Sequence, residues 1–101
     1  MELKETFQFM TSNDYKERFV AEYWQTKIRY EKLRNFCNKI EVSQMMNSDD
    51  YPEPTHNCPL SLLREQQASM GNYLHFLELR ALIECIDLNS INSTKLAINS
   101  K

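Results

Sequence analysis

The chain is short of the residues that interrupt helices. Its 101 residues include one glycine and three prolines, and all four lie beyond residue 50. Residues 13–41 contain neither, so nothing in that stretch opposes a helix, which would be roughly 42 Å long at about 1.5 Å per residue. Residues 11–14 (Thr-Ser-Asn-Asp) precede it with side chains that accept hydrogen bonds from a first helical turn.

Cysteine and long apolar runs are also scarce. Cys37, Cys58 and Cys85 are an odd, well-spread set, which does not indicate a disulfide framework. No Cys-x-x-Cys or His-x-x-x-His spacing occurs, so we expect neither a metal site nor a cofactor. No secretory signal opens the chain, and no run approaches the roughly 20 apolar residues of a membrane span. The sequence therefore predicts a reduced cytoplasmic protein without membrane contact.

The charge balance bears on whether the protein binds nucleic acid. A formal net charge of −2 argues against a DNA- or RNA-binding protein, which would carry a clearly basic domain. Locally, residues 14–41 hold seven Lys/Arg against five Asp/Glu, so this helix is able to hold a small anion. The chain has no Gly-rich phosphate loop, no nucleophile elbow and no paired carboxylates, so we do not expect an enzyme.

What the sequence does have is a helical seam. Its apolar positions alternate at spacings of four and three, which only a helix uses: Phe19, Tyr23, Thr26, Tyr30, Leu33, Cys37 and Ile40. A second row, Val20, Trp24 and Ile28, widens this face beyond what one partner helix covers. The width predicts self-association, with a homo-oligomer as the assembled form.

A second helix follows a linker. Residues 42–58 hold turn formers and two prolines, and Pro59 suits the first position of a helix, with Asn57 or Cys58 as the cap. We therefore predict an all-α fold with two long antiparallel helices, about 13–41 and 59–88, and a short N-terminal helix or arm. Residues 1–88 form the single domain, and residues 89–101 form a polar tail. The second half of helix 59–88 is apolar nearly all round.

A basic and aromatic ladder is the first candidate site. Tyr23, Lys27, Tyr30 and Arg34 recur three and four apart and so share one helix face. Lys and Arg donate charge-assisted hydrogen bonds to phosphate, while Tyr offers a stacking surface to a base. In the alternative, the two tyrosines belong to the helical seam and pack against the other helix. The two cations are then solvent-exposed charges beside the seam, and their aliphatic stems cover apolar surface. For the individual residues the sequence favours this structural alternative.

The second candidate is on helix 59–88. Gly71, the only glycine, lies near Ala68, with Arg64 before it and His75 after it. A glycine inside a helix costs about 1 kcal/mol against alanine, which a close approach of a ligand or another helix would explain. The sequence favours the helix crossing. Gln67 lies in the seam and, when buried, needs hydrogen-bond partners from the opposite helix or from a ligand.

Two blocks of sequence carry a family resemblance. One is DYKERFVAEYWQ at residues 14–25, continuing into KIRYEKL at 27–33, and the other is CPLSLLREQQ at 58–67, followed by MGNYL at 70–74. Over residues 12–88 the chain resembles a family of small helical proteins of phages and prophages of Firmicutes and of crAss-like phages. Its architecture is also similar to the phage anti-CBASS sponge proteins, helical oligomers that sequester cyclic nucleotides between protomers.

These resemblances imply a role class. The leading hypothesis is a phage accessory protein, acting in the cytoplasm of the infected bacterium, that sequesters a cyclic-nucleotide immune signal between protomers. Lys27, Arg34 and Arg64 would hold phosphates, Tyr23 and Tyr30 would stack on or border the base, and Gln67 would complete the set. The alternative is a non-enzymatic adaptor or inhibitor of a host or phage protein, and a third option is a structural virion or packaging accessory.

Overall fold

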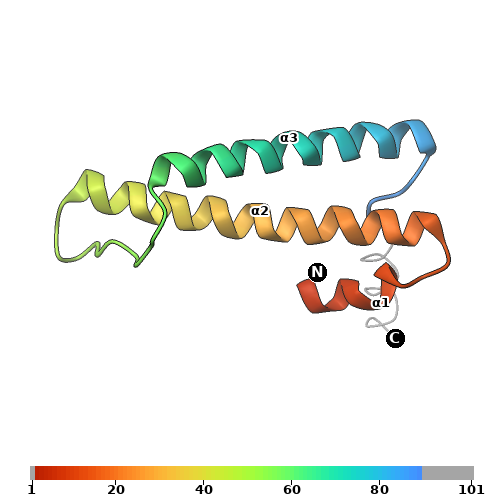
Figure 1. The fold of residues 1–101 in the computed structure, drawn as a ribbon, viewed down its shortest axis with the longest axis horizontal. Coiled ribbons are helices and arrows are strands. Elements are labelled where there is room, and N and C mark those ends of the chain that lie inside the picture. The colour runs from red at the N-terminus through yellow and green to blue at the C-terminus, as the bar shows by residue number, and fades with distance from the viewer. Residues whose placement is uncertain (1, 90–101) are drawn as a thin grey trace.

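The computed structural model describes residues 2–89 (Figure 1). Its elements are a 3-10 helix η1 (Leu3–Thr6), a one-turn helix α1 (Phe7–Met10) and two long helices, α2 (Tyr15–Met46) and α3 (Leu60–Glu84). Residues 2–89 contain no strand, which confirms the predicted all-helical fold. Helices α2 and α3 run antiparallel side by side, while η1 and α1 lie on the other side of α2 (Figure 1). The predicted tail lies outside the described residues, apart from Asn89.

Helix α2 begins as the sequence predicts but continues further. The Asp14 side chain accepts a hydrogen bond from the Lys16 N–H at 2.9 Å, which caps the first turn. The predicted end at residue 41 was too early, because residues 42–46 contain no helix breaker. The helix stops at Asn47, which adopts the left-handed conformation at φ 47° and donates its N–H to the Ser43 carbonyl. Asparagine tolerates this conformation better than most residues.

Both ends of α3 differ from the prediction. Pro59 itself is the N-cap, so neither Asn57 nor Cys58 caps the helix. The helix ends at Glu84 instead of residue 88, because Cys85 turns left-handed at φ 57° and the Ile86 N–H bonds back to the Ala81 carbonyl at 2.8 Å. This turn buries Ile86 in the core, which a continuing helix would not do.

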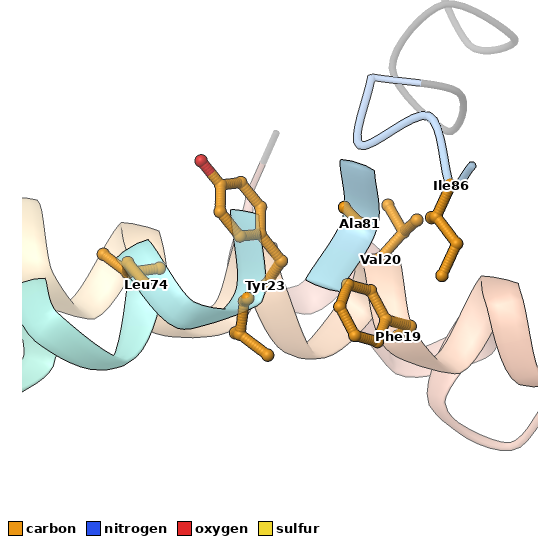
Figure 2. Packing of buried hydrophobic residues seen from close by; sticks show 7 residues of the cluster. Phe19, Val20, Tyr23, Leu74, Ala81 and Ile86 are labelled. Atoms are coloured by element: carbon orange, nitrogen blue, oxygen red, sulfur yellow. The ribbon is translucent and has the colours of Figure 1, made fainter. Parts of the chain in front are cut away.

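The core lies between α2 and α3 near the end where α2 begins. Its side chains come from three segments: Phe19, Val20 and Tyr23 of α2, Leu74, Leu77 and Ala81 of α3, and Ile86. Figure 2 shows this cluster from close by. Farther along α2, the seam residues Cys37 and Ile40 are also fully buried. Thr26, Tyr30 and Leu33 are half-buried. The predicted seam is therefore the face of α2 that meets α3.

The second apolar row of α2 is covered within the chain. Val20 is buried in the core, and the Trp24 indole N–H donates to the Leu88 carbonyl at 2.6 Å, so the segment after α3 folds onto this row. Beside it, the Gln25 amide donates to the buried Thr6 hydroxyl at 2.8 Å and anchors the N-terminal arm. The N-terminal arm and the segment that follows α3 thus cover much of the wide apolar face of α2, for which the sequence analysis predicted a second copy.

Candidate functional site

The predicted site residues lie along one side of the contact between α2 and α3. On α2, positions 23, 27, 30, 34, 38 and 41 form one stripe, and positions 64, 67, 71, 75 and 78 form a matching stripe on α3. Three contacts join the stripes: Tyr23 to Glu78, Tyr30 to Gly71, and Arg64 to both Asn38 and Glu41. We call this surface the ladder flank. The sequence could predict each stripe on its own helix, and the structure adds that the two stripes lie side by side.

At one end of the ladder flank, Tyr23 belongs to the core. Its side chain is 4% exposed, and its hydroxyl donates to Glu78 Oε2 at 3.0 Å. Burial, then the hydrogen bond and charge of Glu78, and finally the charge of Glu31 raise the pKa of Tyr23 to about 12. The ring is thus a neutral structural element, and its faces contact protein rather than solvent.

Lys27 lies directly above this tyrosine. Its ammonium is 3.5 Å from the Tyr23 hydroxyl oxygen and 5.2 Å from the centroid of the Trp24 ring. A cation at this distance from an aromatic face is attracted by the ring quadrupole. Lys27 is half-buried, so its stem covers apolar surface while its charge stays at the edge of the contact between α2 and α3.

At the middle of the ladder flank, Tyr30 packs on the only glycine. A Cβ atom built on Gly71 would meet Tyr30 Cε1 at 3.3 Å, closer than most real contacts of this kind. The close crossing of the two helices therefore explains Gly71, as the structural alternative predicts. The Arg34 guanidinium carbon lies 5.8 Å from the Tyr30 ring centroid, and Arg34 itself is exposed. Of the ladder residues, this pair is the most open to a ligand.

At the far end, Arg64 ties the two helices together. One guanidinium nitrogen donates to Gln67 Oε1 at 2.7 Å, so the oxygen of the seam glutamine finds its partner on its own helix rather than on the opposite helix or a ligand. The other donates to Asn38 Oδ1 at 3.1 Å and lies 3.4 Å from Glu41 Oε2. An incoming phosphate would compete with this carboxylate for the guanidinium.

The sequence analysis missed the acids of this site. Glu41 and Glu78 each meet a ladder-flank side chain across the contact between α2 and α3, and Glu31 acts on Tyr23 through its charge. The positions of Glu41 and Glu78 on the two stripes were visible in the sequence, but their partners lie on the other helix. Glu31 lies on α2, outside both stripes. The flank itself therefore carries two carboxylates, Glu41 and Glu78, beside its three cations, Lys27, Arg34 and Arg64.

Two hollows lie elsewhere, beside the linker. One, of ≈ 350 Å³, lies between the end of α2 and residues 50–54, where Lys39, Val42, Tyr51 and Pro52 line it. The second, of ≈ 290 Å³, lies on the other side of Tyr51. None of the six predicted ligand residues lines either hollow. Both hollows therefore lie away from the ladder flank except at Asn38, which lines the larger one.

Two other features bear on function. Within residues 2–89, no group of three or more potential metal-ligating side chains occurs, and no helix is long and apolar enough to cross a membrane. Arg80 pairs with Glu84 at 3.6 Å, and it also donates to the Tyr15 hydroxyl and covers the Phe19 ring. Arg80 is therefore a structural residue at the end of the core.

Comparison with known proteins identifies the family. Neither the curated proteins nor the solved structures give a significant match to this chain. A family model described as Sequestin matches residues 13–83. The match begins at the cap of α2 and ends near the last turn of α3, so it covers both long helices and the whole ladder flank. The chain belongs to the Sequestin family.

Proposed function

We propose that this protein is a phage-encoded, non-enzymatic sponge that sequesters a cyclic-nucleotide immune signal in pockets between protomers. Membership in the Sequestin family carries the proposal, because the family name denotes sequestration. The predicted likeness to anti-CBASS sponge proteins supplies the ligand class and the phage setting. A sponge acts by stoichiometric binding, so it needs a pocket and no catalytic residue.

The ladder flank is the surface that we assign to the ligand. Of the three flank cations only Arg34 is exposed, and it lies over Tyr30, so a phosphate on Arg34 would place its base near that ring. Lys27 and Arg64 would hold further phosphates at the two ends. Tyr23 and Gln67 contribute by fixing Lys27 and Arg64, since each contacts its cation directly.

Calorimetry against a panel of cyclic dinucleotides, cyclic trinucleotides and cyclic ADP-ribose isomers tests the proposal. We expect one or more members to bind, and Arg34→Ala to weaken binding at least about tenfold, as for loss of a charge-assisted contact. Arg29→Ala is the matched control, because Arg29 lies about 140° around α2 from Arg34. Silence across the panel from folded protein would refute the sponge, and equal losses in both variants would refute this site.

The second candidate is an adaptor or inhibitor that grips a host or phage protein. One observation favours it: the apolar side chains of α3 that face away from α2 are exposed. Large exposed apolar patches mark interaction surfaces. A pull-down that recovers one stoichiometric heterologous protein, together with silence in calorimetry, would favour this function over the sponge.

A further inference from the structure

The larger hollow beside the linker has the size and the lining of a small ligand site. Its ≈ 350 Å³ lie between the end of α2 and residues 50–54, and Val42, Tyr51, Pro52 and Pro54 give it a mostly apolar wall. Ligand pockets in proteins begin at about 300 Å³ and combine apolar walls with a few polar groups. A hollow at the lower end of this range holds a group such as one nucleobase rather than a whole dinucleotide.

Several contacts hold the linker against α2. Figure 1 shows the linker folding back beside the end of this helix. The Gln44 amide donates to Glu53 Oε1 at 3.0 Å, and the His56 ring packs edge-on against Phe36 with 6.4 Å between the ring centroids. The Tyr51 N–H closes a turn by donating to the carbonyl three residues earlier at 3.1 Å. The chain's own contacts therefore form the hollow, and no ligand is needed to shape it.

Asn38 joins this hollow to the ladder flank. Its Oδ1 accepts a hydrogen bond from Arg64 at 3.1 Å, and the same residue lines the hollow. A guanidinium has only donors, so the amide presents its oxygen to Arg64 and turns its NH2 group another way. Within residues 2–89 this NH2 group donates to no protein acceptor. It is therefore available to an acceptor on a ligand.

A cyclic dinucleotide has two bases, and the ladder flank offers an accessible aromatic ring to only one of them. Tyr23 is 4% exposed and its ring faces contact protein, whereas Tyr30 is half-buried beside the exposed Arg34. Tyr51 is 45% exposed and lines the hollow. Stacking on an aromatic side chain suits any base, because every base has a π face. Tyr51 thus supplies the second ring that such a ligand needs.

We propose that the hollow is a base subsite of the nucleotide whose phosphate Arg64 holds. The base lies against the Tyr51 ring, and the Asn38 NH2 group donates to a ring nitrogen or carbonyl oxygen on its edge. This inference rests on the proposed function and extends its site from the ladder flank to the linker. Asn38 lies one turn from Arg34, about 6 Å along α2, so phosphates on Arg34 and Arg64 would be close enough to belong to one ligand.

A nuclear magnetic resonance titration with mononucleotides tests the subsite directly. Adenosine, guanosine and uridine monophosphate each carry one base and one phosphate, whereas ribose 5-phosphate carries the phosphate without a base. We expect at least one mononucleotide to shift the signals of the Val42 methyl groups and the Asn38 NH2 group, and ribose 5-phosphate to leave the Val42 signals unchanged. No shift at Val42 with any mononucleotide, or an equal shift with ribose 5-phosphate, would overturn the subsite.

Calorimetry with the cyclic nucleotide that binds most tightly separates this inference from the sponge. Tyr51→Leu should weaken binding about tenfold, the size expected for loss of one base–aromatic stack. Tyr73→Leu is the matched control, because Tyr73 is similarly exposed at 42% but donates to Glu22 and does not line the hollow. Circular dichroism checks that both variants keep their helix content. Weaker binding by Arg34→Ala with unchanged binding by Tyr51→Leu would overturn the subsite and leave the sponge standing. Silence of every cyclic nucleotide would refute the sponge, while the mononucleotide titration decides the subsite independently.

Discussion

The hydroxyl of Tyr23 makes folding stability depend on pH in a predictable direction. This group donates to Glu78 at 3.0 Å from a ring that is almost fully buried, and its pKa is raised from 10.0 to about 12. The folded protein therefore favours the protonated form more than the unfolded chain does. The resulting stabilisation is fully present below pH 10 and is lost as the pH rises through 12.

The size of the effect follows from the pKa shift. Two pKa units correspond to about 2.7 kcal/mol of differential interaction between the two protonation states. Glu78 is exposed, so water screens part of its charge, and we expect about 1 to 2 kcal/mol in practice. Tyr23→Phe removes the titrating group and the hydrogen bond together. At pH 8 this variant should be less stable by about 1 to 2 kcal/mol.

The assay is urea unfolding of both proteins between pH 8 and 12. The wild type should lose stability above pH 10 more steeply than Tyr23→Phe, so that the difference between them shrinks towards zero. Tyr73→Phe serves as the comparison, because Tyr73 donates to Glu22 and its pKa is also raised, but it lies on the other flank. A constant gap between wild type and Tyr23→Phe across this range would refute the assignment of a buried, Glu78-bound hydroxyl.

Three other substitutions test the packing. Leu77→Ala should destabilise the protein by about 3 kcal/mol in urea unfolding, because Leu77 is 1% exposed and a cavity would remain. Gly71→Ala should change stability by less than about 1 kcal/mol, because the gain in helix propensity is offset by the 3.3 Å contact with the half-buried Tyr30 ring; a larger loss in thermal unfolding would mean that the ring cannot yield. Thr6→Val should cost about 1 to 2 kcal/mol, since it removes the oxygen acceptor of the buried Gln25 amide and leaves it only the weaker sulfur acceptor of Met10. Faster amide exchange of η1 and α1 would accompany that loss, and unchanged exchange would contradict an anchoring role.

The helices were predictable from sequence because their signals are local. The absence of Gly and Pro before residue 50 and the four-three spacing from Phe19 to Ile40 together indicate the helix α2, although not its end. The end of α3 was not predictable in this way. Cys85 adopts a left-handed conformation that few residues favour, and the burial of Ile86 between the helices offsets its cost. This burial depends on the packing of α2 against α3, which a local sequence pattern does not predict.

For the candidate site, too, local spacing predicts some features and tertiary packing decides the others. The spacing of Tyr23, Lys27, Tyr30 and Arg34 correctly placed them on one face of a helix, but Tyr23 and Tyr30 satisfy the seam and the ladder equally well. Only the position of α3 decides between these roles, because Tyr23 meets Glu78, which is 55 residues away in sequence. Sequence identified the stripe, and packing determined which of its members turn inward.

The balance of charge on the ladder flank links ligand binding to assembly. Two carboxylates of the flank, Glu41 and Glu78, lie among its three cations, and the charge of Glu31 also reaches the flank at Tyr23, so an isolated protomer offers a phosphate little net attraction in water.

Exclusion of water strengthens a charge-assisted contact, because the interaction between two charges grows as the effective dielectric falls. A second protomer beside the flank, as the proposed function requires, would supply that exclusion. We therefore expect nucleotide binding, measured by calorimetry, to weaken when the protein is diluted until sedimentation shows only monomer. Full-strength binding by monomeric protein would show instead that one protomer holds the ligand alone.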